Sequence, residues 1–187
     1  MKFMNRTQVL RVLKAAREAS ERDFIMILLG YRHGLRSSEV CSLHAKRHFA
    51  DGYITVKRLK GSEKTSQPLF GSNDPLLDEA AAVPAYLETV SGGYLFPARE
   101  TKTTTSPHIS RQHFHRIFRA HCESAGVPSH LRHAHTLKHS IAVELVKRID
   151  IAELQTFLGH KSLSSTGQYL RISQQQACDA VAAAMRF

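Results

Sequence analysis

Two short motifs near the C-terminus combine imidazole, ammonium and phenol groups. The first reads H-T-L-K-H-S and contains His135, Lys138 and His139, and the second reads L-G-H-K around His160. Tyr169 follows nine residues after His160. Imidazole titrates near neutrality, so these histidines can donate hydrogen bonds or move protons. A phenol can act as a nucleophile when a base or nearby cations help it to lose its proton. The pattern combines a candidate nucleophile with groups that can move protons or stabilise negative charge.

Two further cationic positions lie in the N-terminal half of the chain. Arg36 lies in G-L-R-S-S-E with Glu39 three residues on, and Lys60 lies in a polar turn, K-G-S. The planar guanidinium of Arg36 suits bidentate phosphate contact. Taken alone, each of these residues has a simpler explanation. Arg36 and Glu39 could form a surface helix pair, Lys60 could lie at a solvated hairpin tip, and Tyr169 could be a partly buried aromatic residue. Their order along the chain outweighs these explanations.

In this order the motifs resemble the catalytic domain of the tyrosine site-specific recombinases, the phage lambda integrase superfamily. The family pattern is approximately H-x-L-R-H-S, then L-G-H, then a tyrosine about nine residues on, preceded by a first-arginine motif and a hairpin lysine. The resemblance runs from about residue 7 to residue 173. It implies a catalytic set supported by Glu39 and His139. That set is Arg36, Lys60, His135, Lys138, His160 and Tyr169.

The resemblance also implies a mechanism. Tyr169 would attack a DNA phosphodiester to form a 3′-phosphotyrosine, and Lys60 would protonate the 5′-oxygen that leaves. Cationic side chains stabilise the extra negative charge of the transition state. Because the phosphotyrosine bond keeps the phosphodiester energy, a DNA 5′-hydroxyl can reverse the step without ATP or metal. We expect no cofactor.

One catalytic position departs from the family pattern. Where the family has its second arginine, this chain has Lys138. Lysine keeps the charge but lacks the rigid fork, so it makes only a point-charge contact with phosphate. Loss of one preorganised donor typically lowers a rate by about 10²–10³, and the retained charge recovers part of that. We expect a slow but competent enzyme, with Arg132 a nearby cation that could substitute.

Helical periodicity and turn signals predict the elements that position these residues. Thr7 is the expected cap of the first helix, and the apolar run 24–29 predicts a buried second helix that ends near Gly34. The pattern at 53–70 predicts an antiparallel hairpin with a polar turn at 57–67. Further helices are expected at 37–43, at 73–87, after Ser110, and at 135–148, 151–158 and 174–185, with a short strand at 94–96. The expected fold class is therefore α+β, mainly α-helical, with a small antiparallel sheet at one edge.

The charge pattern indicates a nucleic-acid partner. The chain has 187 residues with a formal net charge of +10, and residues 65–98 contain no Lys or Arg. Phosphate-contacting cations are therefore expected on the hairpin and between residues 107 and 148. The proposed DNA-binding residues are Lys57, Arg58, Lys64, Arg111 and Arg116. The expected partner is double-stranded DNA, with modest and salt-dependent affinity.

Composition narrows the class of protein further. The length suits one domain with a full core, 1–187, without the N-terminal core-binding domain that many family members carry. Three cysteines without paired spacing indicate no disulfide framework, and no apolar run is long enough for a membrane helix. We expect a cytoplasmic, nucleoid-associated protein that is not bound to a membrane. Cys41 and Cys122 are expected in the core.

Alternatives remain for the histidines and for the function. Crowded imidazoles could hold zinc, but the chain lacks an H-E-x-x-H motif or a cysteine partner; the four histidines are His130, His133, His135 and His139. A type IB topoisomerase-like relaxing activity would use the same chemistry without pairing two DNA sites. From another class, a catalytically impaired DNA-binding accessory or regulatory relative would explain Lys138. A generic RNA-binding module fits less well, because there is no aromatic ladder to stack bases.

The expected C-terminal helix, 174–187, has an apolar side. It could pack on its own domain or, as is common in the family, on a neighbouring protomer. The second arrangement would link activation to assembly of a homo-tetramer on two DNA sites.

Overall fold

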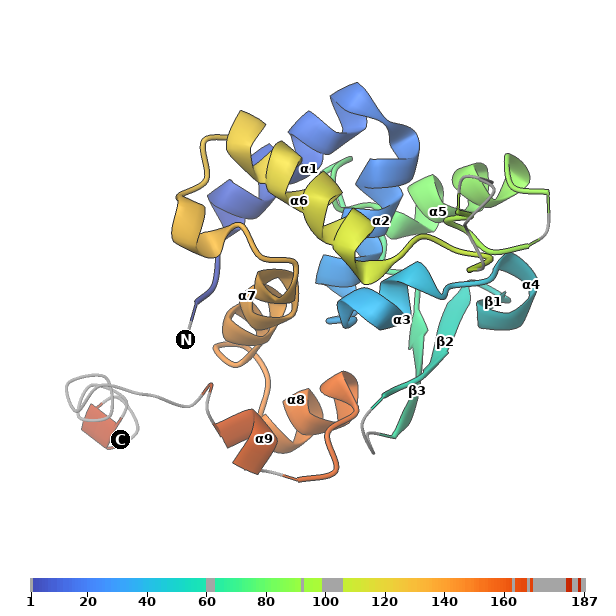
Figure 1. The fold of residues 1–187 in the computed structure, drawn as a ribbon. Helices are drawn as coiled ribbons and strands as arrows, with labels where there is room; N and C mark the ends of the chain where they lie inside the picture. Colours follow the sequence, from blue (N-terminus) through green and yellow to red (C-terminus); the bar gives the residue numbers. More distant parts are fainter. Residues whose placement is uncertain are drawn as a thin grey trace.

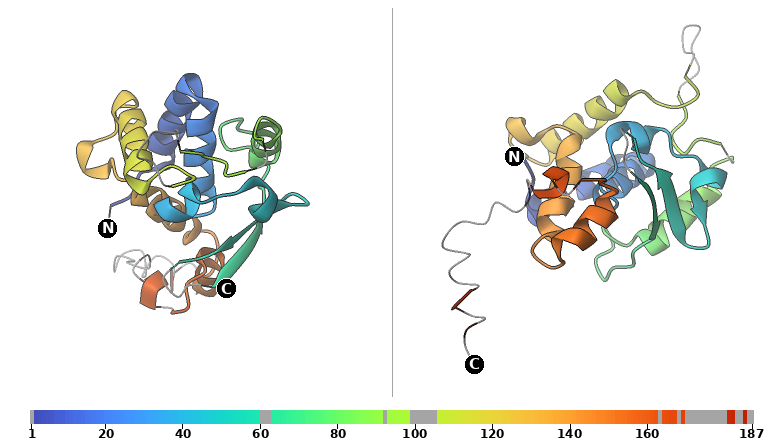
Figure 2. Two further views of the ribbon diagram at one scale, coloured as in Figure 1. Left: turned by 45° about the vertical axis from the view of Figure 1, so that its right-hand side comes forward. Right: turned by 90° about the horizontal axis from the view of Figure 1, so that it is seen from below.

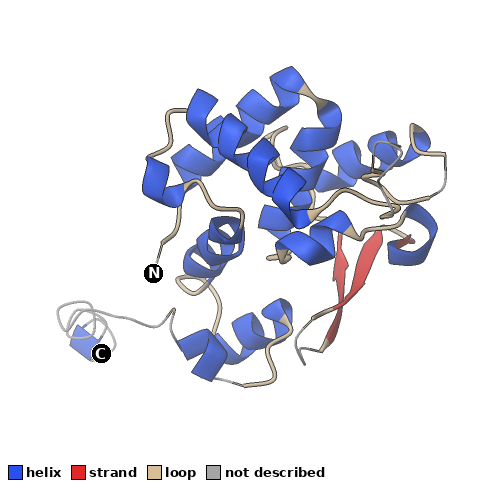
Figure 3. Cartoon of the chain, in the orientation of Figure 1, coloured by secondary structure: helices blue, strands red, loops and turns tan. Residues whose placement is uncertain are grey.

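Helices make up most of the structure, and one small sheet lies at its edge (Figures 1 and 3). The computed structural model describes residues 2–59, 63–91, 93–98, 106–162, 164–167, 169, 181–182 and 185. Within this part of the chain, no helix is long and apolar enough to cross a membrane. The elements are α1 (Arg6–Ala19), α2 (Glu21–Arg32), α3 (Ser37–Cys41), α4 (Ala45–His48), β1 (Phe49–Ala50), β2 (Tyr53–Lys57), β3 (Lys64–Pro68), α5 (Glu79–Glu88), α6 (Arg111–Ser124), the 3₁₀ turn η1 (Ser129–Leu131), α7 (His135–Leu145), α8 (Ile151–Leu158) and α9 (Ser164–Gly167).

Helix α2 runs through the core. Its apolar run, Phe24 to Leu29, has no measurable exposure, which confirms the prediction of a buried helix. Each such side chain stabilises the fold by about 1.5–3 kcal/mol when removed from water. Cys41 and Cys122 are buried in the same core, as predicted.

Helix α1 begins earlier than predicted. Its cap is Asn5 and not Thr7: the Asn5 side chain accepts from the Gln8 backbone, and the Gln8 side chain accepts from the Asn5 backbone. This reciprocal capping box satisfies two backbone N–H groups that a helix start leaves unpaired. The predicted cap of α6, Ser110, is confirmed and accepts from His113 N at 3.1 Å.

The sheet is antiparallel with the order β1-β2-β3. Its pairing joins Tyr53 to Pro68 and Lys57 to Lys64, so the predicted hairpin is present but its second strand begins earlier than expected. The strand starts at residue 64 because Thr65 and Gln67 turn inward opposite the buried face of β2. Lys60 lies outside the described residues. The short elements α4 and β1 were not predicted.

Between residues 73 and 98, one predicted helix is present but begins late, and one predicted strand is absent. The helix expected from residue 73 begins only at Glu79, where Asp78 caps it by accepting from Ala81 N. Residues 94–96 do not form a strand; Tyr94 makes an isolated bridge with His44. Asp74 accepts from Leu76 N in a local turn, which competes with helix formation there.

The C-terminal helices differ less from their predicted bounds. Helix α7 ends at Leu145, before the predicted residue 148, and α8 has the predicted bounds. Most of the expected helix 174–185 lies outside the described residues.

Arg58 corrects the prediction of a DNA contact, because its side chain is buried. The guanidinium donates to the carbonyl oxygens of His33 at 3.3 and 3.4 Å, of Gly34 at 2.9 Å and of Leu158 at 3.3 Å. It also forms an ion pair with Glu39, Nε to Oε2, at 3.5 Å. Arg58 therefore joins the hairpin to the C-terminal ends of α2 and α8, where unpaired carbonyls attract a cation.

Two glycines allow this close approach. Gly34 has a φ of +56° and Gly159 a φ of +65°, in the left-handed region that favours glycine. A Cβ on Gly34 would lie 2.8 Å from Leu158 Cδ2, and one on Gly159 would lie 3.0 Å from Arg58 Cγ. The two turns therefore pack against each other and against Arg58. Figures 1 and 2 show the resulting arrangement, with α8 beside the ends of β2 and β3.

We predict that Arg58→Ala lowers the free energy of unfolding by about 3 kcal/mol, because it removes the buried ion pair with Glu39 and leaves several carbonyl oxygens without their donor. The control is Lys57→Ala: Lys57 is the exposed neighbour of Arg58, and its loss should change stability by less than about 0.5 kcal/mol. Urea unfolding followed by circular dichroism measures both. Equal effects of the two substitutions would contradict a structural role for Arg58.

Candidate active site

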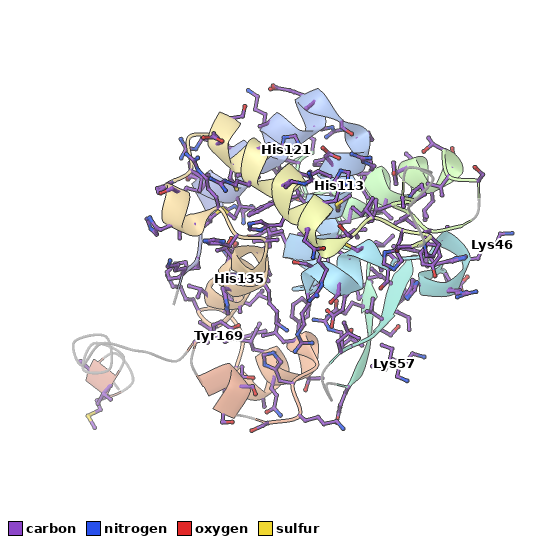
Figure 4. The ribbon with its side chains drawn as sticks, viewed as in Figure 1. Lys46, Lys57, His113, His121, His135 and Tyr169 are labelled. Carbon is purple, nitrogen blue, oxygen red and sulfur yellow. The ribbon has the colours of Figure 1, made fainter. Side chains whose placement is uncertain are left out.

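A cleft of about 1010 Å³ brings together most of the predicted catalytic residues. Its walls come from the start of α3, one face of α6, the first half of α7 and the segments after α8 and α9. The chemistry-bearing residues that line it are Arg36, Arg111, His115, Arg116, His135, Lys138, His139, His160, Lys161 and Tyr169. Figure 4 shows His135 on α7 with Tyr169 below it.

Arg36 enters the cleft from the turn that follows Gly34. Its backbone N–H and its Nη1 donate to the Glu39 carboxylate at 2.8 and 3.0 Å, and Nη1 also donates to Leu59 O at 3.0 Å. Glu39 is only 2% exposed, so this pair is not the surface pair that its spacing suggests in isolation. Burial raises the pKa of Glu39, but Arg58 and the hydrogen bonds from Arg36 and Leu59 outweigh it and hold the pKa below its usual value. Glu39 stays ionised and orients both arginines.

Lys138 is a buried cation without a hydrogen-bond partner. The residue is 8% exposed, and among the described residues none accepts a hydrogen bond from Nζ. Burial, followed by repulsion from Arg58 and Arg36, lowers the pKa of Lys138 to about 7. Lys138 lines the cleft, and its lowered pKa is the consequence of burial beside two arginines.

Arg132 does not replace the missing arginine. Its guanidinium donates to Glu123 Oε1 and to Val127 O, both at 2.8 Å, and Arg132 is not among the residues that line the cleft. Its side chain ties the end of α6 to the following turn. The substitution suggested by its position in the sequence is therefore wrong.

His160 follows the left-handed Gly159 at the end of α8. Its Nδ1 lies 2.9 Å from Thr166 Oγ1, and its backbone carbonyl accepts from Gln155 Nε2 at 2.9 Å. Burial, and then Lys138 and Arg36, lower the pKa of His160 to about 4. The imidazole is neutral at pH 7, and the contact with Thr166 orients its ring in the cleft.

Tyr169 places its phenol at the wall of the same cleft. The residue is 7% exposed, and Oη lies 3.0 Å from His139 Nδ1. Burial raises the pKa of Tyr169 to about 12, although Arg36 acts in the opposite direction. A buried phenol of this kind needs a proton acceptor before it can act as a nucleophile.

His135 belongs to a row of imidazole rings along the cleft. The ring of His133 stacks between those of His115 and His135 at centroid distances of 5.6 and 5.5 Å, and His135 meets His139 edge-on at 5.7 Å. Burial and repulsion by His133 lower the pKa of His135. Of the residues that the structure describes, no three His, Cys, Asp or Glu side chains are placed to hold a metal ion.

The remaining predicted DNA contacts lie in two places. Arg111 and Arg116 line the cleft from α6, whereas Lys57 and Lys64 are exposed opposite each other on the hairpin. Figure 4 shows Lys57 extending outward from the sheet. Sequence reasoning missed His115 and Lys161 as cleft residues. The spacing of four residues from Arg111 to His115 and the position of Lys161 directly after His160 are the signals that could have found them.

These contacts define a catalytic domain of the tyrosine recombinase class, in which a tyrosine and several cations face one cleft. The comparison with protein families agrees: residues 2–176 match the phage integrase family, and the chain belongs to that family.

Two curated relatives are similar over most of this chain. The tyrosine recombinase XerA of Pyrococcus furiosus is 32% identical over 184 residues, which cover 96% of this chain and 60% of XerA. The type 1 fimbriae regulatory protein FimE of Escherichia coli is 32% identical over 157 residues, which cover 79% of this chain and 73% of FimE. A crystal structure of XerA recombinase has the same fold, with a TM-score of 0.76 at 19% identity over 99% of this chain and 65% of that one. The chain thus spans less than two thirds of the length of XerA.

We predict that Lys138→Met raises the free energy of unfolding at pH 7 by about 1–2 kcal/mol, because it removes a buried group that lacks a partner. The folded-state pKa of about 7 lies below the ordinary 10.5, so Lys138 costs stability fully below pH 7. That cost fades as the pH rises toward 10, and the two proteins should converge there.

Chemical unfolding at several pH values measures this difference. Inorganic phosphate should also stabilise the wild type more than the Lys138→Met variant. The control is Lys161→Met, a change at an exposed lysine of the same cleft. A Lys138→Met variant less stable than the wild type at pH 7 would contradict the interpretation of Lys138 as an unpaired cation.

Proposed function

We propose that this protein is a site-specific DNA recombinase that cuts and rejoins DNA strands through a covalent 3′-phosphotyrosine intermediate. The observation that carries the proposal is the shared cleft of Tyr169 with Arg36, Lys138 and His160. A candidate nucleophile and several groups that can bind phosphate meet there. A DNA phosphodiester fits both the nucleophile, which would attack its phosphorus, and the cationic groups, which would bind its oxygens.

The cleft residues have separate roles in this reaction. Arg36 binds the nonbridging phosphate oxygens, and Glu39 and Leu59 O hold its guanidinium in place. His160 and His135 donate hydrogen bonds to the same phosphate, and Lys138 adds positive charge as the transition state gains negative charge. Lys60 protonates the leaving 5′-oxygen. The phenolic oxygen of Tyr169 attacks phosphorus from its position beside His139.

Double-stranded DNA is the partner, held mainly through its phosphates. Arg111 and Arg116 extend the cationic wall of the cleft along α6, and Lys57 and Lys64 provide a second contact on the hairpin. A solved recombinase with this fold, XerH, is described as bound to its difH substrate. Binding that depends on phosphate contacts should weaken steeply with salt.

We also propose that the protein acts as a homo-tetramer on two DNA sites, with the segment 174–187 packed on a neighbouring protomer. Val181 is 52% exposed and Met185 is 68% exposed, so these apolar side chains have surface left to bury. A neighbour in fold is described as a lambda integrase tetramer bound to a Holliday junction. If the tail of each protomer packs on the next protomer around a closed ring, this apolar surface is buried in every protomer.

The second candidate function is a catalytically impaired DNA-binding accessory or regulatory protein. Lys138 favours it, because an unpartnered lysine with a pKa of about 7 stabilises a transition state less than an arginine that is always charged. The two candidates differ in one observable: only the recombinase leaves DNA covalently attached after denaturation.

We predict that the wild-type protein forms a denaturation-resistant complex with nicked duplexes drawn from the DNA that flanks its gene, and that Tyr169→Phe does not. The matched control is Tyr53→Phe, because Tyr53 is 48% exposed on the sheet, away from the cleft. A denaturing gel with end-labelled DNA measures the adduct. A wild type that shifts DNA on a native gel but forms no adduct would support the accessory function.

We predict that Lys138→Arg increases the single-turnover cleavage rate by about 10-fold at pH 7.5, since the fork and the permanent charge are restored. The wild-type rate at limiting DNA should also fall as the pH rises above about 7, because Lys138 then loses its proton. The Arg variant should lack this decline. An unchanged or lower rate for Lys138→Arg would contradict a handicapped site.

A further inference from the structure

The side chain of Lys138 places a buried amine between the cleft and two arginines. Its Nζ is enclosed, and none of the described residues accepts a hydrogen bond from it. Lys138 packs against the turn at Gly34: a Cβ on Gly34 would lie 3.8 Å from Lys138 Cγ, and the Gly34 carbonyl accepts from Arg58 Nη2 at 2.9 Å. The same turn leads to Arg36, which lines the cleft together with Lys138. The amine is therefore held beside guanidinium groups.

These surroundings favour the neutral amine over the ammonium. Arg58 and Arg36 repel the proton of Lys138, and Glu39 attracts it less strongly. Together with burial, they lower the pKa of Lys138 to about 7, so about half of the molecules carry a neutral amine at pH 7. A lysine with the ordinary pKa of 10.5 is neutral in only about one molecule in 3,000 at that pH. The nitrogen of Lys138 thus has a free lone pair in much of the protein.

Two histidines also face Lys138, and neither adds charge to the group. Burial and then Lys138 lower the pKa of His160 to about 4. Burial, followed by repulsion from His135 and Lys138, lowers the pKa of His139. These imidazoles are neutral at pH 7, so the charges around the amine come from the arginines and from one carboxylate.

A negative group at this position would balance those charges. With an ammonium on Lys138, the set of Arg36, Arg58, Lys138 and Glu39 holds three cations and one anion. With an anionic group on the same nitrogen, it would hold two of each. Buried charges are tolerated when they are paired, so the surroundings of Lys138 favour a modification that makes it negative.

Carbon dioxide is the reagent that suits this amine. It reacts with neutral amines to form carbamates, which are anions. It is also uncharged and among the smallest electrophiles, so it can reach an enclosed nitrogen that a larger aldehyde or ester cannot. The cleft of about 1010 Å³ borders Lys138 and provides room for the added carboxylate.

We propose that Lys138 is a carbamylation site, at which the amine takes up carbon dioxide to form a carbamate whose negative charge is stabilised by Arg36 and Arg58. The Nζ lone pair forms a bond to the carbon of carbon dioxide, one C=O π bond breaks with its electron pair moving to oxygen, and the nitrogen releases one proton to solvent. Nothing is oxidised or reduced. Loss of carbon dioxide restores the amine, so the modification is reversible.

The carbamate would oppose strand cleavage, and this consequence rests on the proposed function. A DNA phosphate favours the ammonium form of Lys138, whereas carbon dioxide consumes the neutral amine, so each lowers the affinity for the other. The carbamate also places negative charge beside Arg36, where a phosphodiester would bind. An arginine at position 138 stays protonated and cannot respond in this way.

The first test is carbon-13 NMR of the purified protein with labelled bicarbonate at pH 7.5, in a buffer without phosphate or free amines. The wild type should show a carbamate resonance that Lys138→Arg and Lys138→Met lack. The matched control is Lys161→Met, a change at an exposed lysine of the same cleft, which should keep the resonance. The α-amino group also forms carbamates in all four proteins, so only the resonance that depends on Lys138 counts. Circular dichroism verifies that each variant is folded.

A second variant tests the contribution of a guanidinium. Arg36→Gln should lower the carbamate fraction about threefold at pH 7.5, which is the loss of neutral amine that a rise of one pKa unit at Lys138 produces. An unchanged fraction would contradict the stabilisation by Arg36 and overturn that part of the proposal.

The last measurement is single-turnover cleavage of the nicked duplex with and without bicarbonate at constant pH and ionic strength. The wild-type rate should fall by the fraction of protein that NMR shows as carbamate, whereas Lys138→Arg should keep its rate. An equal fall in both proteins would overturn the link between Lys138 and inhibition.

The two proposals fail in different ways. A wild type without a resonance that depends on Lys138 would overturn the carbamylation site, whether or not the protein cleaves DNA. A carbamate resonance that persists in Lys138→Arg would assign the reaction to another amine and overturn it as well. A wild type that shows the resonance but forms no covalent adduct with DNA would overturn the proposed function and leave the carbamylation site in place.

Discussion

The buried guanidinium of Arg58 is the interaction on which the rest of the site depends. It binds carbonyls at the C-terminal ends of α2 and α8 and pairs with Glu39, which in turn orients Arg36. The turn that carries Arg36, the strand that leads to the hairpin tip and the turn that carries His160 therefore converge on one side chain. A planar group with five donors can make all these contacts at once, which a lysine cannot.

The same convergence concentrates positive charge where few anions balance it. Glu39 is the carboxylate that both Arg36 and Arg58 contact. Beside these arginines, the pKa values of Lys138 and His160 are lowered. Such a cluster lowers the stability of the free protein, and a bound phosphate offsets this cost by supplying negative charge. The cleft therefore gathers cations at a cost to the stability of the fold.

The sequence predicted the elements with strong local signals and the order of the site residues, but not their contacts. The apolar run of α2 and the cap Ser110 are local features, and so their predictions were confirmed. The charge of Arg58 suggests a DNA contact, but the residue continues the alternation in which Ile54 and Val56 face inward, and this alternation predicts its burial correctly. The contact between His139 and Tyr169 depends on how α7 and the segment after α9 pack, which no local pattern encodes.

Lysine at position 138 changes the way in which the cleft carries charge. An arginine there would stay protonated whether or not DNA is bound, so its charge would repel Arg36 and Arg58 permanently. With its pKa lowered to about 7, Lys138 can release its proton where an arginine cannot. Deprotonation relieves part of the repulsion among these buried cations. Lysine in place of arginine thus has two consequences. Loss of the bidentate fork lowers activity, whereas relief of buried charge raises stability.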